Sequence, residues 1–418
     1  MNIREPRQFD KVRADRKALD RRRHQRKLFR TGIVVALVIV LVFSGLYARP
    51  LPSVSAKTLP LTVATTPVAL AWPTAGQASI GTQSQGVLAS TNNQQPVPTA
   101  SVAKVMLALA VLKKYPLALG QQGPRVPITA ADVDLYNKYF AIDGSTVAVA
   151  EGEQITEYQA IQAALLPSAN NMADTLAVWA YGSMAAYYSA ANGIAQSLGM
   201  TRSTFAGDAS GFLPETVSTA SDIVLMGQAA LNNPVIAEIV AQETAELPVA
   251  GTVRNVNFLL GEEGNVGIKT GNSDQAGGCY LFAVKRIVEG RTITAIGAIL
   301  ASPTRGQAIL GSRPLADSFF KGFGQVTVLP KNTVVGNYQL PWGGQIAAKT
   351  VQDATVFNWR GSKTAVRAKL LLLKAPKAAD SPAGVVELKT PYDSKTVAVT
   401  TAQPINAPTW QWRIFNRQ

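Results

Sequence analysis

An uncharged apolar run, TGIVVALVIVLVFSGLYA at residues 31–48, constrains this chain more than any other feature. Its length is near the lower limit for a helix that crosses the hydrocarbon core of a bilayer. The preceding residues 1–30 contain twelve Arg and Lys against four acids. Positive charge beside an apolar helix remains on the cytoplasmic side of a membrane. The sequence therefore predicts a basic cytoplasmic tail at 1–30, a single membrane-spanning helix at 31–48, and an extracytoplasmic remainder.

A cleaved signal peptide is the alternative interpretation of this run. The basic segment is unusually long for a signal peptide, and the one suitable small-residue cleavage site, at 54–56, lies well past the apolar residues. We therefore expect an uncleaved anchor in the cell membrane, with a single pass.

Charge and residue usage exclude several classes of function. The formal net charge is +14, and about +8 of it belongs to residues 1–30. No later segment interleaves basic and aromatic residues as a single-strand binder does, so no nucleic-acid partner is expected. The single histidine, His24, lies in the predicted cytoplasmic tail, so an outer hydrolase lacks a Ser-His-Asp triad and a His-rich metal site. We predict neither a metal nor a cofactor, and interpret the single cysteine, Cys279, as a strand-core residue.

The chain divides by composition and periodicity. Residues 49–70 are rich in Pro, Thr and Ser and predict a linker. Residues 71–325 predict the main domain, with two strands at its start, Ala-rich helices over 155–200, three strands after Val266 and a closing helix from Pro314. A further helix is expected to open at Ser221 or Asp222. This order favours an α/β (α+β) sandwich in which the first and last strands share a sheet.

Residues 326–418 consist of short apolar segments separated by turn residues, and predict a small C-terminal all-β domain. In its expected final strand, Trp410, Trp412 and Ile414 alternate onto one face, which is typical of core residues.

The segment PTASVAKVMLALAVLKK, residues 98–114, predicts a buried helix with one hydroxyl and one amine at its start. Ser101 and Lys104 are three residues apart and so share a helix face. Burial among apolar residues would lower the pKa of Lys104 and let it accept the proton of Ser101. The S-x-x-K pattern alone is weak, since Ser318 and Lys321 also match it in what we interpret as an ordinary helix.

Two further motifs follow in order. Ser168-Ala-Asn170 precedes a helix, although S-x-N also occurs at Ser90-Thr-Asn92. Lys269-Thr270-Gly271 lies on a predicted strand and is the only K-[ST]-G match in the chain.

Together the three motifs resemble the S-x-x-K, S-x-N and K-T-G set of the penicillin-recognising serine enzymes. Within that superfamily the chain resembles the low-molecular-mass penicillin-binding proteins that are D-alanyl-D-alanine carboxypeptidases, over about residues 75–325. Residues 96–112, 144–177, 197–231 and 267–286 carry the resemblance. It implies a β-lactamase/transpeptidase-like catalytic domain, followed by a β domain that resembles the appended domain of these enzymes by position and strand content.

The resemblance also implies roles for nine residues. The catalytic group is Ser101 as acylated nucleophile, Lys104 as its base, and Ser168 as a proton relay toward the leaving amine. The substrate-binding group is Asn170 for the substrate amide, Lys269 and Thr270 for the terminal carboxylate, Gly271 for close approach of the substrate backbone, Asn272 for the oxyanion hole with the amide of Ser101, and Arg305 as a weaker carboxylate ligand.

Three features depart from the family pattern. Asn171 stands where Asp is common after S-x-N, and Asn272 follows K-T-G where His is common. Many relatives attach through an amphipathic C-terminal helix, whereas the predicted anchor here is N-terminal.

The expected function is removal of the terminal D-Ala from peptidoglycan stem peptides through an acyl-enzyme on Ser101, with β-lactam antibiotics as inhibitors. A β-lactamase or a DD-endopeptidase of the same superfamily is one alternative. The absence of an E-x-x-L-N sequence after S-x-N disfavours the β-lactamase. A non-catalytic cell-wall-binding scaffold is the other alternative, which the complete motif set disfavours.

Overall fold

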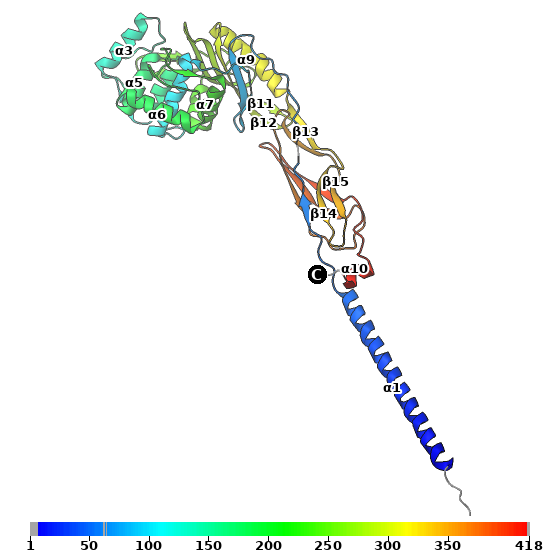
Figure 1. Ribbon diagram of the computed structural model, residues 1–418. Helices are drawn as coiled ribbons and strands as arrows, with labels where there is room; N and C mark the ends of the chain where they lie inside the picture. Colours follow the sequence, from blue (N-terminus) through cyan, green and yellow to red (C-terminus); the bar gives the residue numbers. More distant parts are fainter. Residues whose placement is uncertain (1–6, 62, 64, 416–418) are drawn as a thin grey trace, which may run out of the picture.

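The computed structural model describes residues 7–61, 63 and 65–415, which form an elongated molecule with three parts (Figure 1). A long helix, α1 (Arg7–Ala48), lies at one end, a β domain lies in the middle, and the α/β domain that carries the motifs lies at the far end. The predictions of a mixed α/β sandwich, a C-terminal β domain and an N-terminal apolar helix are confirmed.

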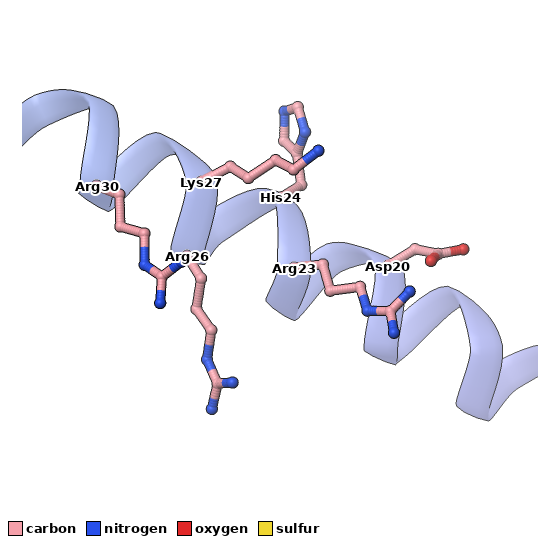
Figure 2. Close-up of a pocket in the computed structure, with 6 residues that line it drawn as sticks. All are labelled: Asp20, Arg23, His24, Arg26, Lys27 and Arg30. Atoms are coloured by element: carbon pink, nitrogen blue, oxygen red, sulfur yellow. The ribbon is translucent and has the colours of Figure 1, made fainter.

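Helix α1 has 42 residues, which at 1.5 Å per residue gives a length of about 63 Å. Within the described residues it is the one helix that is, on its own, long and apolar enough to cross a membrane, and its apolar part is not buried by the protein. A signal sequence near an N-terminus would have the same properties. The helix also includes most of the predicted basic tail. Figure 2 shows side chains of that segment, Asp20, Arg23, His24, Arg26, Lys27 and Arg30, projecting from the bare helix around a shallow hollow.

The α/β domain is built on a five-stranded antiparallel sheet with the order β10-β11-β12-β2-β3. Its strands are β2 (Gln77–Thr82), β3 (Gly86–Ser90), β10 (Asn265–Ser273), β11 (Gly277–Val288) and β12 (Arg291–Ser302). As predicted, the first strands of the domain join the sheet formed by the last ones. The motif strand β10 is an edge strand of this sheet.

Alternation along β11 divides the core into two layers, because successive side chains of a strand point to opposite faces. Cys279, Leu281 and Ala283 belong to the helical side, which contains α2 (Lys104–Lys114) and α7 (Ala220–Asn232). Tyr280 and Phe282 belong to the opposite side, which α9 (Arg305–Phe320) covers. The sheet is therefore buried on both faces, and its position fixes β10 beside the helical layer.

The remaining elements of this domain are short or belong to the helical layer. The helices are η1 (Ala100–Ala103), α3 (Ala130–Ala141), α4 (Glu157–Leu165), α5 (Asn170–Tyr181), α6 (Met184–Ser197), α8 (Pro234–Val240) and η2 (Glu262–Gly264). The paired short strands are β4 (Val97–Pro98) with β7 (Val217–Ser218), β5 (Arg125–Pro127) with β6 (Gln154–Thr156), and β8 (Thr244–Leu247) with β9 (Gly251–Arg254).

Two predicted helix starts were wrong. Helix α7 begins at Ala220, because the hydroxyl of Thr219 accepts from the amide of Asp222 at 3.1 Å and caps the helix earlier than expected. Helix α9 begins at Arg305, with Thr304 as its cap, and contains Pro314 in its interior. Its apolar side chains are buried against β11 and β12, and this burial outweighs the backbone hydrogen bond that proline removes.

The C-terminal β domain contains a six-stranded sheet with the order β1-β14-β15-β19-β18-β17 and a separate pair, β13 with β16. Its strands are β13 (Phe323–Leu329), β14 (Val334–Gln339), β15 (Gln345–Thr350), β16 (Ala354–Trp359), β17 (Ala365–Leu370), β18 (Pro382–Lys389), β19 (Ser394–Thr401) and β1 (Ala56–Thr58). Strand β1 comes from the segment that composition predicted as a linker. It pairs with β14, and Val54 just before it is fully buried and forms a bridge with Leu373.

The expected final strand is instead a short helix, α10 (Trp410–Phe415). Thr409 begins it, because its carbonyl accepts from the amide of Arg413 and its hydroxyl accepts from the amide of Trp412. The helix packs on the end of α1: the Phe415 ring lies 6.1 Å from that of Phe43. The alternation of Trp410, Trp412 and Ile414 along the sequence therefore did not indicate a strand, because the backbone of this segment is helical.

The two domains share a continuous core. Phe319 of α9 packs against Trp359 of β16 and against Phe323 of β13, each at 5.4 Å between ring centroids. Beside this core, the hydroxyl of Tyr392 donates to that of Thr82 at 2.9 Å. The β domain is therefore packed onto the α/β domain and not joined to it by a flexible link.

Glu157, the first residue of α4, is fully buried, and neither of its carboxylate oxygens has a hydrogen-bond partner within the described residues. Burial raises the pKa of this carboxyl from 4.5 to about 7. A carboxyl whose pKa is raised by folding binds more protons in the folded than in the unfolded state between these two values. The folded state therefore loses stability as the pH rises from about 4.5 through 7.

We predict that Glu157→Gln removes this pH dependence, because the amide does not ionise. Relative to the wild type, the variant gains about 1–3 kcal/mol of unfolding free energy between pH 4.5 and pH 8. Chemical denaturation at a series of pH values measures the difference, with the exposed Glu151→Gln as control. Parallel stability curves for the wild type and Glu157→Gln would contradict the prediction.

Candidate active site

Ser101 and Lys104 lie at the junction of two helical segments. Ser101 is in the 3-10 turn η1, and Lys104 is the first residue of α2. The Lys104 Nζ donates to Ser101 Oγ at 2.7 Å. Just before the serine, Ala100 has a φ of 45°, a left-handed conformation that costs free energy in a residue with a Cβ. Such strained residues persist where the surrounding structure holds them. Here the strained backbone of Ala100 places the side chain of Ser101 toward the Lys104 amine.

Lys104 is completely buried and has two further acceptors. Its Nζ donates to Asn170 Oδ1 at 2.7 Å and to the carbonyl oxygen of Ser210 at 3.1 Å. Removal from water lowers the pKa of Lys104 from 10.5 to about 7, against the opposing effect of two nearby carboxylates, Asp208 and Asp174. A substantial fraction of this amine is therefore neutral near pH 7, and in that form it can accept the proton of Ser101.

The S-x-N motif forms the loop between α4 and α5. Asn170 is the first residue of α5, and its amide donates to the carbonyl of Ser145 at 2.7 Å. Ser168 lies two residues earlier, is 6% exposed, and has a φ of 69°. The motif thus contributes one side chain in direct contact with Lys104, Asn170, and a buried serine held in a left-handed turn beside it.

The K-T-G motif lies on β10 and passes close to the serine. A Cβ added to Gly271 would lie 3.1 Å from the amide nitrogen of Ser101 and 3.1 Å from the carbonyl oxygen of Thr99. This close approach explains why the position is glycine. Asn272, the next residue, is exposed on the same edge strand, and Thr270 is buried.

Lys269 is a second buried amine, 1% exposed. Its Nζ donates to the carbonyl of Thr270 at 3.0 Å. Its pKa is well below the usual value for lysine, because of burial first and then because of the positive charges of Lys104 and Arg305. The two motif lysines therefore face the same region of the domain, where the positive charge of Lys104 disfavours protonation of Lys269.

Arg305 reaches this region from α9. Gly278 of β11 lies opposite Asn272 of β10, and a Cβ on it would lie 2.5 Å from the amide of Arg305. The exposed side chain of Arg305 therefore begins beside the end of the motif strand β10. The second S-x-x-K match does not join the site: Ser318 lies within α9, where its hydroxyl donates to the carbonyl of Leu315.

Sequence reasoning missed the loop that completes the environment of Lys104. Ser210, Asp208 and Asp174 surround this amine, although only the Ser210 carbonyl touches it. The segment GDASGF belongs to residues 197–231, which carry the family resemblance, and its Gly, Asp and Ser residues indicate a turn. Neither signal gave these residues a role at the site. A backbone carbonyl has no residue type of its own, so no motif could have identified this contact.

The arrangement suits acyl transfer. It joins a hydroxyl, a desolvated amine within hydrogen-bond distance that can act as its base, and a second buried amine on an edge strand of the sheet.

Comparisons with known proteins agree with this geometry. Residues 73–298 match the family model described as D-alanyl-D-alanine carboxypeptidase. The chain is 31% identical over 207 residues to D-alanyl-D-alanine carboxypeptidase DacB2 of Mycobacterium tuberculosis, covering 48% of this chain and 66% of the relative. It is 30% identical over 218 residues to a D-alanyl-D-alanine endopeptidase of Pseudomonas aeruginosa, covering 50% of this chain and 66% of that protein.

The fold is similar to that of penicillin binding protein 5 from Haemophilus influenzae, with a TM-score of 0.56 and 18% identity, over 82% of this chain and all of that one. These matches confirm the resemblance that the three motifs indicated.

We predict that Lys104 titrates near pH 7, well below the ordinary lysine pKa of 10.5, because burial destabilises its ammonium form. Lysine-specific 13C NMR of residues 49–418 measures this as a Cε signal that titrates with a midpoint near pH 7. The signal is assigned to Lys104 by its loss in Lys104→Met. A midpoint above pH 9 for that signal would rule out the neutral amine.

Proposed function

Because the chain belongs to the D-alanyl-D-alanine carboxypeptidase family, we propose that it is a serine DD-peptidase that removes the terminal D-Ala from peptidoglycan stem peptides. The observation that carries the proposal is the 2.7 Å contact between Ser101 Oγ and the buried amine of Lys104, with β10 packed against the serine amide. The matched segments cover slightly less than two thirds of each curated relative, so the activity rests on the site and not on the similarity alone.

In the acylation step, the neutral amine of Lys104 takes the proton of Ser101 as Oγ attacks the carbonyl carbon of the penultimate D-Ala. The oxyanion that forms accepts from the amides of Ser101 and Asn272, a contribution of about 3 kcal/mol in comparable sites. The C–N bond to the terminal D-Ala then breaks. The leaving nitrogen receives the proton held by Lys104, relayed through Ser168, which restores the neutral amine, and the acyl group remains on Ser101 as an ester.

In the deacylation step, water attacks that ester as the neutral amine of Lys104 takes one of its protons. The bond from the acyl carbon to Ser101 Oγ then breaks, and Lys104 passes that proton to Oγ. Lys269, Thr270 and Arg305 bind the carboxylate of the terminal D-Ala before it leaves, since an amine, a hydroxyl and a guanidinium are all hydrogen-bond donors suited to a carboxylate. Asn170 holds the substrate amide. The close approach of β10 at Gly271 lets the peptide lie along the strand edge as an added strand.

The similarity to an endopeptidase favours a second candidate, cleavage of a cross-link between stem peptides. The two reactions break the same type of bond and share every step of the acyl transfer. They differ in the leaving group, which is free D-Ala in one and a cross-linked stem in the other.

We further propose that α1 anchors the protein in the cell membrane as a single span, with the catalytic and β domains outside. The apolar part of α1 is unburied by protein, and a basic segment precedes it on the same helix (Figure 2). Peptidoglycan stem peptides are then the substrates, and β-lactam antibiotics, which carry a strained amide that Ser101 can open, are inhibitors.

We predict that Ser101→Ala abolishes both covalent labelling by a fluorescent penicillin and release of D-Ala from a pentapeptide ending in D-Ala-D-Ala, each by about 10³-fold or more. Gel fluorescence and an assay for free D-Ala measure the two. A cross-linked peptide dimer, assayed by mass spectrometry, distinguishes the endopeptidase.

The matched control is Ser318→Ala, which alters the serine of the other S-x-x-K match and leaves both activities unchanged. Rapid turnover of the penicillin would favour a β-lactamase instead. A wild-type protein that neither labels nor releases D-Ala would favour a non-catalytic scaffold.

We predict that the protein is recovered in the membrane fraction of cells and that its penicillin-labelled band retains an N-terminal epitope tag. Placing arginine in the span, as in Val38→Arg with Leu41→Arg, reduces this fraction, because each charge costs about 2.5–3.5 kcal/mol at the centre of a membrane helix. A labelled band that has lost the tag would show a cleaved signal peptide.

A further inference from the structure

Two buried carboxylates behind Lys104 are not explained by the catalytic steps. Asp174, on α5, is 7% exposed, and Asp208, in the loop before α7, is 5% exposed. Burying a carboxylate is costly unless its oxygens are bound by donors. Within the described part of the chain neither forms an ion pair. Their burial must therefore be explained by other hydrogen-bond donors and by a positive charge that they do not touch.

Asp208 organises the loop that contacts Lys104. Its Oδ1 accepts from the amide of Ser210 at 2.7 Å, from the hydroxyl of Ser210 at 2.8 Å and from the amide of Phe212 at 3.2 Å. Its Oδ2 accepts from the amide of Leu213 at 2.6 Å. One carboxylate thus folds residues 208–213 around itself, and this turn directs the carbonyl of Ser210 at the Lys104 amine, 3.1 Å away.

Asp174 attaches the same loop to the helical layer. Its Oδ1 accepts from the amide of Ala209 at 3.0 Å, and its Oδ2 accepts from the hydroxyl of Tyr139 at 2.7 Å. Asp174 is four residues after Asn170 on α5, so the two side chains share a helix face. The helix that contributes one acceptor to Lys104 therefore also fixes the loop that contributes another.

The loop has little freedom on its other side. Gly211 has a φ of 70°, and a Cβ on it would lie 2.2 Å from the carbonyl oxygen of Ala100. The turn therefore lies directly against η1, next to the nucleophile. A shift of this turn would move the Ser210 carbonyl and the strained residue before Ser101 together.

From these contacts we infer that Asp208 and Asp174 are positioning residues for Lys104, which hold the Ser210 carbonyl on its amine and supply the negative charge that balances its ammonium form. The inference rests on the proposed function, since it concerns the base of that reaction. Neither carboxylate touches the reacting atoms. They act on Lys104 through the hydrogen bonds that hold the loop in place and through electrostatic interaction without direct contact.

The charge balance around Lys104 supports this assignment. The charged groups that face it are Asp208 from the loop, Asp174 from α5 and Lys269 from β10, with Arg305 of α9 acting on Lys269. The neighbouring phenols, Tyr139 of α3 and Tyr187 of α6, have pKa values raised far above 10 by burial and remain neutral. Burial lowers the pKa of Lys104, and the two carboxylates are the groups that raise it.

The test is the pH dependence of the acylation rate constant for a fluorescent penicillin, measured on the full chain in detergent. The rate falls at low pH as Lys104 becomes protonated. Asp208→Asn removes a negative charge, so we expect the midpoint of this acidic limb to move down by about half to one pH unit. Asp174→Asn moves it in the same direction by a smaller amount, because burial raises the pKa of Asp174 and so reduces its ionised fraction on that limb. We also expect a lower plateau rate, because the amide cannot accept all the hydrogen bonds of the carboxylate.

The matched control is Asp222→Asn. Asp222 is a similarly buried carboxylate, 6% exposed, which accepts from the amide of Arg202 at 2.8 Å and from the hydroxyl of Ser203. It does not act on Lys104, so its replacement leaves the midpoint unchanged even if it lowers thermal stability. If one of the two test variants fails to fold, the other measures a shift in the same direction.

A midpoint that stays at the wild-type value in Asp208→Asn and Asp174→Asn, with only the plateau lowered, would overturn the inference and leave a purely structural role. Failure of the proposed function gives a different result, because the wild type itself would then show no acylation of Ser101.

Discussion

The buried amine of Lys104 is the feature on which the rest of the catalytic domain depends. An ammonium group removed from water is unstable unless acceptors surround it. Three segments that are far apart in sequence supply those acceptors: the serine of η1, the first residue of α5 and the loop at Ser210. The domain can bury this amine only when all three are in place, so the fold and the reactivity of the site have the same requirement.

The sheet contributes through steric fit as much as through charge. Strand β10 lies at the edge of the sheet, and Gly271 is the point at which it approaches the serine amide. A side chain there would have to displace Ala100, whose backbone is already strained. The same closeness brings Lys269 toward Lys104, so the cost of placing two amines together is set by the path of one strand.

Much of this was accessible from sequence, because it depended on local pattern. The apolar helix with Ser101 and Lys104 at its start, and the strand alternation that fixes the sheet, are written in neighbouring residues. The misjudged elements were those decided by distant contacts. Pro314 lies inside α9 because the sheet buries the helix around it, and Trp410–Phe415 is helical where its alternation suggested a strand. Ser210 acts through a backbone carbonyl, which any residue type could supply. Asp174 and Asp208 come close to Lys104 only when α5 and the loop pack together in the fold.

Strand β1 gives the molecule a mechanical property. The polypeptide crosses the boundary between the β domain and the catalytic domain twice, once on the way out and once on the way back, and the first crossing is hydrogen-bonded to both domains. The amide of Thr66 donates to the carbonyl of Arg360 at 3.1 Å, and that of Ala71 donates to Ser318 Oγ at 2.9 Å. A single crossing would allow one domain to rotate relative to the other. Two crossings restrain that rotation, so the β domain holds the catalytic domain in a defined orientation.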